Sequence, residues 1–384
     1  MILKPSHLKK TSRIFVGMSG GVDSSVVAAL LKDQGYQVVG LFMKNWDETD
    51  ENGVCSSQKD YEDVAKVCDH IGIPYYSVNF VEEYQQQVFD HFLTDYEQGF
   101  TPNPDILCNR EIKFNVFLKK AKALGADFLA TGHYCQLDYT DPTSPLLLKG
   151  KDPNKDQSYF LHAVPKELFK DVLFPIGGLE KTEVRVLAQK YGLATQDKKD
   201  STGICFIGKR KFQPFLENYI RPKKGEFRNL DETPVGTHLG AHYYTLGQRK
   251  GLGLGGPGDP WFVVKKNISK NRVYVERGET HPALFTRWLK TDDFNWLVSK
   301  IPRFPFDCKI KVRYRQIDQD AFIQEEEGAY KITFKKPQRA VTPGQYVVLY
   351  QDKVCLGGGR IKSVSPTLWD EKTLASPSQI DQNQ

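Results

Sequence analysis

Residues 17–24 read Gly-Met-Ser-Gly-Gly-Val-Asp-Ser, between an apolar run and an amphipathic run. The pattern predicts a strand, a glycine-rich turn and a helix that starts at the turn. Unpaired N–H groups and the helix dipole make such a helix start suitable for a phosphate or pyrophosphate. Gly20 and Gly21 let the backbone approach an anion closely, and Asp23 offers a carboxylate for Mg²⁺.

The form of this motif narrows the chemistry. A P-loop requires Gly-x4-Gly-Lys-Ser/Thr, and this stretch has no lysine. Ser-Gly-Gly-x-Asp-Ser is instead typical of the pyrophosphate loop of enzymes that split ATP to AMP and pyrophosphate. ATP and Mg²⁺ are therefore the predicted cofactors.

The bulk composition is that of an ordinary globular protein with 384 residues, which favours two or three domains. No apolar run reaches the roughly 18–20 residues that a membrane helix needs, so we expect no membrane partner. The seven cysteines are scattered and include no Cys-x2-Cys pair. This usage favours a reducing, cytoplasmic location and argues against a disulfide scaffold or a zinc knuckle.

The positive charge is concentrated in the second part of the chain. Residues 1–220 carry 26 Lys and Arg against 29 Asp and Glu, whereas residues 221–384 carry 27 against 18, a net charge of +9. A basic region of this kind favours a polyanionic partner such as a nucleic acid.

The first part alternates strand and helix patterns. Strands are predicted at 13–18, 37–43, 74–80 and 127–131, and helices at 22–34, 57–71, 81–97, 111–124 and 180–191. Such alternation predicts an open α/β sheet with parallel strands, whose ligands bind beyond the carboxyl ends of the strands. The glycine-rich turn and the turn at 131–134 both lie at that edge.

After about residue 218 the helical pattern gives way to Gly, Pro and β-branched residues. Short strands are predicted at 261–265, 272–276, 308–315, 329–334 and 345–350. We therefore expect an α/β catalytic domain at 1–218, a small central β-rich domain at 219–287, a second small β-rich domain at 288–372 and a disordered tail at 373–384.

Two cysteine neighbourhoods are candidates for chemistry. Cys108 is predicted to lie just before a helix capped by Asn109, beside Arg110, which would stabilise a thiolate, and Asp105 is close enough in sequence to transfer a proton. Cys205 follows a polar turn in Asp-Ser-Thr-Gly-Ile-Cys-Phe-Ile-Gly. Buried structural roles remain open for both cysteines, since free Cys is usually buried.

Several other polar residues stand out. Cys55 lies in a polar loop and is a third candidate, whereas Cys68 falls on the apolar face of a helix. His133 is predicted at a strand end on the ligand edge. Arg313 and Arg315, on one face of a predicted strand, could grip phosphates, or could form an ordinary solvated surface.

Together these segments closely resemble the tRNA-specific 2-thiouridylases (MnmA/TrmU family). The matching runs are GMSGGVDSS, LFMKNW at 41–46, NPDILCNREIKF at 103–114, ATGHY at 130–134, KDQSYFL at 155–161, DSTGICFIG at 200–208, YTLGQRKGLGLGG at 244–256, VRYRQ at 312–316 and PGQYVVLY at 343–350. The resemblance implies an adenine nucleotide alpha hydrolase-like first domain and a final β-barrel.

The resemblance also implies roles for the matching positions. It implies that the catalytic residues are Cys108, Cys205 and Asp105. The residues implied for ATP are Gly17, Met18, Ser19, Gly20, Gly21, Val22, Asp23, Ser24, Met43 and Gly132, with Asp23 also binding the metal. Those implied for tRNA are Asn103, Pro104, Asp105, His133, Lys155, Asp156, Gln157, Arg313, Tyr314, Arg315 and Gln345.

The implied reaction replaces the C2 oxygen of the wobble uridine in tRNA by sulfur. AMP transferred to that oxygen makes it a good leaving group, and a persulfide on Cys205, supplied by a donor protein, provides the sulfur. Lys, Glu and Gln acceptor tRNAs are the implied substrates.

Three alternatives remain at this stage. An ATP-pyrophosphatase acting on a small molecule would share the loop but leave the cysteines and the basic region unexplained. A non-catalytic RNA-binding module would leave the intact loop unexplained. A third variant keeps the substrate, with an iron–sulfur cluster held by the cysteines and Asp105.

Overall fold

The computed structural model describes residues 5–46, 56–199, 212–291 and 293–375. Its first unit contains a five-stranded parallel sheet in the order β3-β2-β1-β4-β7. The strands are β1 (Arg13–Met18), β2 (Gln37–Lys44), β3 (Tyr75–Asn79), β4 (Phe128–Ala130) and β7 (Val172–Leu173). The predicted open α/β sheet is confirmed.

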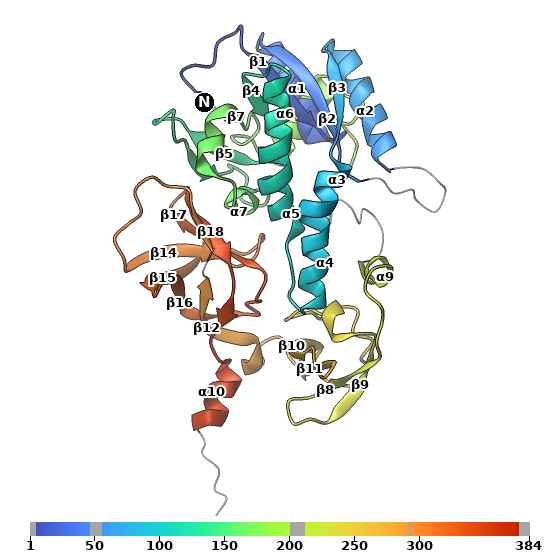
Figure 1. Ribbon diagram of the computed structural model, residues 1–384, viewed down its shortest axis with the longest axis vertical. Helices are drawn as coiled ribbons and strands as arrows, with labels where there is room; N and C mark the ends of the chain where they lie inside the picture. Colours follow the sequence, from blue (N-terminus) through green and yellow to red (C-terminus); the bar gives the residue numbers. More distant parts are fainter. Residues whose placement is uncertain (1–4, 47–55, 200–211, 292, 376–384) are drawn as a thin grey trace, which may run out of the picture.

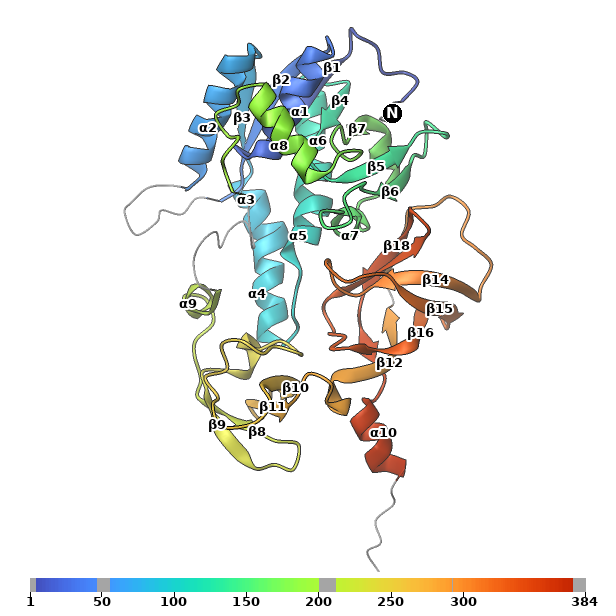
Figure 2. The same ribbon diagram turned by 180° about the vertical axis from the view of Figure 1, so that it is seen from behind.

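Both faces of this sheet are covered, because apolar residues occupy successive positions of its strands. Ile14 and Val16 of β1 pack in a cluster with α1 (Val22–Asp33), and Phe15 packs in the opposite cluster with residues of α6 (Leu118–Ala123). Figure 2 shows α8 (Lys181–Lys190) beside α1, near α2 (Ser56–Ile71). Continuous apolar runs are typical of parallel strands buried on both faces.

Two long helical rods extend from the sheet toward the rest of the molecule (Figure 1). The first comprises α3 (Val81–Tyr84), the π-helical η1 (Gln85–Phe89) and α4 (Asp90–Glu97). The second comprises α5 (Pro104–Leu107), the π-helical η2 (Cys108–Phe117) and α6. The second rod corrects the helix predicted at 111–124, since Asn103 precedes the first helical residue and Pro104 occupies the first turn.

The middle unit is a four-stranded sheet in the order β10-β11-β8-β9. Its elements are α9 (Phe212–Glu217), β8 (Gly225–Arg228), β9 (Pro234–His238), η4 (Ala241–Tyr243), β10 (Trp261–Asn267) and β11 (Arg272–Arg277). Phe227, Val263 and Val273 share a buried cluster with Phe89 and Phe92 of the first rod. The rod therefore anchors the middle unit.

The last unit is built on an antiparallel sheet. Strand β13 directly follows β12 in the chain but pairs with β18, which is distant from β12 in the strand order, so the sheet curves back on itself. Its elements are η5 (Pro282–Leu284), β12 (Phe285–Thr291), β13 (Phe294–Trp296), β14 (Phe306–Lys311), β15 (Gln319–Glu326), β16 (Ala329–Arg339), β17 (Tyr346–Gln351), β18 (Val354–Arg360), β19 (Ser363–Val364) and α10 (Leu368–Ala375). The prediction of two β-rich units after the α/β unit is confirmed. Helix α10 extends three residues into the tail predicted from 373, and residues 376–384 lie outside the described part.

A hairpin from the first unit joins this last sheet, which the sequence did not indicate. It consists of β5 (Cys135–Asp138) and β6 (Leu146–Lys149), and Leu148 pairs with Val354 of β18. The N–H of Lys149 donates to the carbonyl of Lys353 at 2.9 Å. The segment then continues through α7 (Ser158–Leu161) and η3 (Lys166–Asp171) to β7. The first and last units thus share one sheet, and the boundaries at 218 and 287 stay predictions.

Candidate active site

The glycine-rich turn lies between β1 and α1, as predicted. Gly20 has a φ of +68°, and a Cβ there would lie 2.7 Å from the carbonyl oxygen of Asp60, so only glycine fits. Gly21 precedes α1 in an extended conformation and provides no side-chain cap. The N–H of Ser19 donates to the Ser24 hydroxyl at 3.2 Å, which curls the turn around the start of the helix. The helix start is thus left open for an anion.

The carboxylate of Asp23 is held by two residues that sequence reasoning missed. Lys181 Nζ donates to the two carboxylate oxygens at 2.7 and 2.9 Å, and the Tyr134 hydroxyl donates to Oδ1 at 2.7 Å. Lys181 begins α8, the helix after β7, so it also follows the carboxyl end of a parallel strand. That position was the available sequence signal for a ligand-side residue.

A second lysine, Lys198, binds the backbone of the glycine-rich turn. Lys198 Nζ donates to the carbonyl of Gly20 at 2.9 Å and to the carboxylates of Asp60 and Asp63 at 2.8 Å each. These bonds tie the turn to α2. Sequence reasoning missed Lys198 as well, since no local pattern relates it to the distant Asp60.

The residues expected to bind ATP gather at one edge of the sheet. Gly17–Ser24 follow β1, Met43 lies near the end of β2 and Gly132 follows β4, and these three strands are neighbours. A Cβ on Gly132 would lie 3.1 Å from the Asp23 Cβ and 3.1 Å from the Ser24 nitrogen. Gly132 therefore packs closely against the start of α1, and the carboxylate of Asp23 beside the uncapped helix start suits the metal and phosphates of a nucleotide.

Cys108 lies elsewhere than predicted. It is the fifth residue of the helical rod that begins at Pro104, not a residue before a helix, and Asn109 is no cap. The Asn109 amide donates to the Phe160 carbonyl at 3.4 Å, and Arg110 pairs with Glu111 at 2.6 Å. Cys108 is 2% exposed, so the argument for a thiolate at a helix start is wrong.

The surroundings of Cys108 nevertheless connect it to the nucleotide edge. Cys108 belongs to the buried cluster that joins the first rod to the middle sheet, and Met43 packs against the same cluster. The cysteine also begins a π-helical segment, a conformation that occurs frequently at functional sites. A reaction at Cys108 would require this buried thiol to become accessible when a substrate binds.

Burial alters the titration of two predicted site residues. It raises the pKa of Asp105, against the opposing effect of Lys113. It lowers the pKa of His133 well below its usual value, and Lys113 adds to this effect. The Nδ1 of His133 lies 2.8 Å from the Thr131 hydroxyl, so a hydrogen bond holds the buried ring.

All three units meet at the turn that leads into Asn103. Gln345 of the last unit donates to the carbonyls of Thr101 and Pro102 at 2.6 and 3.2 Å. The hydroxyl of Thr101 lies 3.2 Å from that of Thr245 in the middle unit. Asn103, Pro104 and Asp105 therefore lie directly after a three-way junction of the units, and their contact with the target base stays a prediction.

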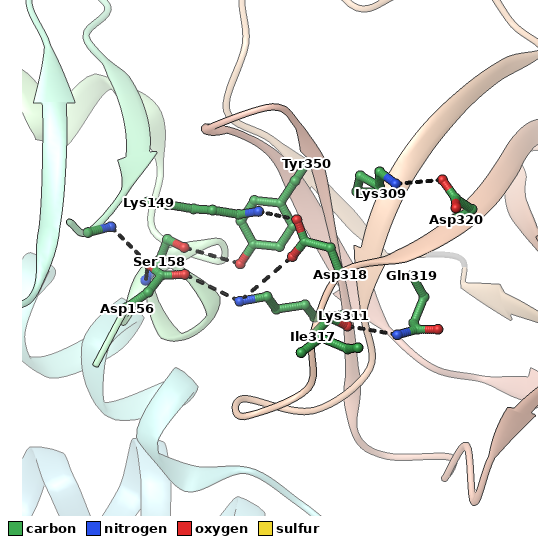
Figure 3. Close-up of polar contacts among 11 residues, drawn as sticks. Lys149, Asp156, Ser158, Lys309, Lys311, Ile317, Asp318, Gln319, Asp320 and Tyr350 are labelled. Carbon is green, nitrogen blue, oxygen red and sulfur yellow. Dashed lines mark hydrogen bonds and ion pairs between the residues drawn. The ribbon is translucent and has the colours of Figure 1, made fainter. Parts of the chain in front are cut away.

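Two segments that are expected to contact tRNA also meet: the 155–157 loop of the first unit and the 313–315 run of the last unit. The Tyr314 hydroxyl donates to the Lys155 carbonyl at 3.2 Å, and the Tyr134 N–H donates to the Gln157 side chain at 3.0 Å. Asp156 is 4% exposed and pairs with Lys311, as Figure 3 shows. The Asp156 side chain therefore joins the first and last units, and its contact with tRNA stays a prediction.

The Arg313–Arg315 run is a turn rather than part of the strand predicted at 308–315, because β14 ends at Lys311. The Val312 N–H donates to the Gln316 side chain at 2.8 Å instead of to a neighbouring strand. Arg313 and Arg315 are exposed, and Arg313 donates to the Ala340 carbonyl at 2.6 Å. Their exposure therefore comes from the turn and not from strand alternation, and their contact with phosphates stays a prediction.

Cys205 and Cys55 lie outside the described residues, so the expected approach of Cys108 and Cys205 stays a prediction. Cys68, Cys135, Cys308 and Cys355 are buried, as expected of packing residues. Within the described ranges, no group of three or more His, Cys, Asp and Glu side chains is placed to hold a metal ion. Nor does any helix in those ranges have the length and apolar character needed to cross a membrane.

Family models match the three units in turn. One described as tRNA methyl transferase HUP domain matches residues 12–209, a tRNA methyl transferase PRC-barrel domain matches 213–277 and an aminomethyltransferase beta-barrel domain matches 286–361. The matches define the class: a HUP domain followed by a PRC-barrel and a β-barrel domain.

Full-length relatives narrow the class further. The tRNA-specific 2-thiouridylase MnmA of Protochlamydia amoebophila (strain UWE25) is 58% identical over 366 residues, covering 95% of this chain and 97% of that protein. The MnmA of Halalkalibacterium halodurans is 55% identical over 354 residues, covering 92% and 95%. The chain belongs to the tRNA-specific 2-thiouridylase (MnmA) family.

Among solved structures, the U34-tRNA thiolase NcsA from Methanococcus maripaludis is 18% identical and covers 53% of this chain and 65% of its own, with a TM-score of 0.35.

Proposed function

We propose that this protein is a tRNA-uridine 2-sulfurtransferase that uses ATP to replace the C2 oxygen of the wobble uridine by sulfur. The observation that carries the proposal is the pyrophosphate turn itself, in which Asp23 faces Lys181 and Tyr134. The turn lies at the sheet edge where Met43 is also found. Met43 packs against the buried cluster that contains Cys108. Membership in the 2-thiouridylase family supports the choice of substrate and product.

The first chemical step activates the uridine. A C2 carbonyl is a poor electrophile, and its oxygen is a poor leaving group. Attack of O2 on the α-phosphate forms the adenylated base and releases pyrophosphate, which the helix start at 21–24 and Lys181 would stabilise. Asp23 would hold Mg²⁺, which offsets negative charge on the leaving pyrophosphate when it is bound.

Proton transfer accompanies both steps. Adenylation at O2 requires the loss of the N3 proton, and the product regains a proton at N3. Asp105 follows Asn103 and Pro104 at the three-way junction, where the target base is proposed to lie. Because burial raises its pKa, Asp105 is suited to take up and return this proton.

The second step transfers sulfur. The terminal sulfur of a Cys205 persulfide attacks C2, and AMP leaves. The Cys108 thiolate then attacks Cys205 Sγ, which breaks the sulfur–sulfur bond and leaves sulfur on the base and a Cys108–Cys205 disulfide on the protein. A thiol reductant must reopen that disulfide. This step requires a persulfide-donating protein partner.

The proposal includes the domain limits and the biological setting. The domain at 1–218 would supply ATP chemistry and the cysteines, and the domains at 219–287 and 288–372 would hold tRNA. The substrates would be Lys, Glu and Gln acceptor tRNAs in the cytoplasm.

Mass spectrometry of tRNA nucleosides tests the proposal. After incubation with ATP, Mg²⁺, a persulfide donor and a thiol reductant, we expect 2-thiouridine derivatives at the wobble position, together with AMP. Omission of ATP should prevent both. AMP release stimulated by ammonia or amino acids, without stimulation by tRNA, would instead identify a small-molecule ATP-pyrophosphatase.

A further inference from the structure

Four charged side chains meet at the junction between the first and last units (Figure 3). Lys149 and Asp156 come from the hairpin and the loop after it, and Lys311 and Asp318 come from the end of β14 and the turn that follows. Lys149 pairs with Asp318, and Lys311 Nζ lies 3.4 Å from Asp156 Oδ2 and 3.8 Å from Asp318 Oδ1. Two of these ion pairs therefore cross the junction.

The Lys311–Asp156 pair is buried. Their side chains are 9% and 3% exposed, so water cannot solvate either charge in place of its partner. The other carboxylate oxygen of Asp156 also has hydrogen-bond partners, because Oδ1 accepts from the N–H groups of Gly150 and Ser158 at 3.1 Å each. Loss of one partner from such a pair leaves an uncompensated buried charge.

An aromatic residue completes the arrangement. The ammonium groups of Lys149 and Lys311 lie 4.3 and 5.5 Å from the centre of the Tyr350 ring, and the Tyr350 hydroxyl lies 3.1 Å from that of Ser158. The lysines are therefore fixed by cation–π contacts as well as by carboxylates. Ion pairs, cation–π contacts and the contact between the Tyr350 and Ser158 hydroxyls together fix the position of β14 relative to the loop before α7.

This junction links two segments proposed to contact tRNA. Asp156 is the middle residue of Lys155-Asp156-Gln157, and Lys311 precedes Arg313 by two residues. Tyr314 crosses the same boundary, since its ring lies 4.4 Å from that of Phe160 and its hydroxyl donates to Lys155. A shift of either segment would separate Arg313 and Arg315 from Lys155 and Gln157.

We propose that Lys311 is a positioning residue for tRNA, which holds the 155–157 loop and the 313–315 turn in one binding surface through its buried pair with Asp156. Lys311 itself is 7% exposed and does not need to touch the nucleic acid. This inference rests on the proposed tRNA substrate and adds the residue that sets the geometry of its binding surface.

The test compares Lys311→Met with Lys309→Met. Lys309 lies on the same strand and pairs with Asp320 at 2.7 Å, but both side chains are about half exposed and the pair stays within the last unit. We expect Lys311→Met to raise the Kd and KM for tRNA about tenfold, with kcat and the KM for ATP within about twofold of the original protein. Lys309→Met should leave all four values unchanged, since exposed pairs contribute little.

Two further variants separate positioning from general stability. Lys311→Arg retains the cation and should bind tRNA within about twofold of the original protein. Lys311→Met combined with Asp156→Asn removes the unpaired charge, so its melting temperature should recover while its tRNA affinity remains low. Recovery of both properties would show a purely structural role and would overturn the proposal, as would unchanged tRNA affinity in a folded Lys311→Met variant.

The result is distinguishable from a failure of the proposed function. The original protein is first assayed for tRNA thiolation and for tRNA binding. Absence of both in that protein would refute the function, and the variants would not be needed. Normal thiolation with tRNA affinity that is insensitive to Lys311 would refute only the positioning role.

Discussion

Lys181 Nζ lies 2.7 and 2.9 Å from the two carboxylate oxygens of Asp23, and the lysine side chain is only 13% exposed. A cation from α8 thus pairs with the only carboxylate of residues 17–24. Engagement of that carboxylate by Mg²⁺ would free the ammonium group to face the phosphates. In the proposed mechanism, the pair would thus provide a positive charge for the pyrophosphate leaving group.

Replacement of Lys181 by Met should weaken ATP binding. We expect the KM for ATP to rise about tenfold, because one close charge contact with the phosphates is lost. AMP formation measured against ATP concentration provides the readout. Lys190→Met, at the exposed end of the same helix, is the matched control and should leave the KM unchanged. Equal values for the two variants would exclude Lys181 from the nucleotide site.

Asp23→Ala should abolish AMP formation, because the variant loses the proposed metal ligand. A loss of about 100-fold or more in rate is expected for removal of a group that organises leaving-group charge. Radiolabelled ATP and separation of AMP would measure it. Asp33→Ala, at the exposed end of the same helix, controls for helix stability. Undiminished AMP production by Asp23→Ala would rule out the assigned pyrophosphate turn.

Gly132→Ala should raise the KM for ATP and lower the free energy of unfolding. The new Cβ would lie 3.1 Å from both the Asp23 Cβ and the Ser24 nitrogen, so the start of α1 must shift. Displacement of this kind costs roughly 1–3 kcal/mol in a well-packed region. Gly255→Ala, where nothing lies within 4 Å of the added methyl, is the control. Unaltered ATP kinetics would show that the nucleotide does not depend on this close packing.

Cys108→Ser should stop the release of thiolated tRNA while one AMP per enzyme is still formed, because AMP leaves when the persulfide attacks C2, before Cys108 acts. Nucleoside mass spectrometry and AMP assays on the same sample separate the two steps. Cys68→Ser is the control: burial and Asp69 raise the Cys68 pKa to about 12, which makes it an inert thiol. Thiolation that survives Cys108→Ser would contradict its catalytic role. Full thiolation by Cys205→Ser with a persulfide donor would likewise contradict the persulfide assignment.

Asp105→Asn should change the pH dependence of stability with a definite sign. Because burial raises the folded-state pKa of Asp105 above its usual value of 3.8, the folded protein holds this proton more tightly than the unfolded chain. The carboxyl group therefore lowers stability as pH rises from about 3.8 through the raised pKa. The Asn variant should gain melting temperature relative to the original protein at pH 7, but little at pH 3. A gain that is larger at pH 3 would mean that the group is stabilised as a carboxylate.

The sequence identified the nucleotide edge because its signals are local. The glycine-rich turn and the Gly132 turn each follow a buried strand, and parallel pairing brings such ends together. Lys181 and Tyr134 were missed because their importance arises from contact with Asp23, from positions 158 and 111 residues away. No spacing rule relates residues so far apart.

Local patterns at Asn109 and at 313–315 indicate structures that the chain does not form. Asn109 resembled a helix cap, whereas Pro104 after an extended Asn103 marks the actual start of the rod. Arg-Tyr-Arg alternates as a strand would, but Gln316 supplies a side-chain acceptor for Val312 and ends the ladder. The hairpin at 135–149 forms a sheet with a partner far along the chain, which a local pattern does not encode.

That hairpin has a consequence for biosynthesis. Leu148 pairs with Val354, which is synthesised about 200 residues later. Strand β6 therefore leaves the ribosome well before its partner strand does. At 5–20 residues per second, the edge of β6 stays uncovered for roughly 10–40 s in each round of translation. An open strand edge is a template for pairing with other chains, so nascent copies on one messenger are at risk of joining through it. We expect truncated chains that end before β18 to require chaperone protection.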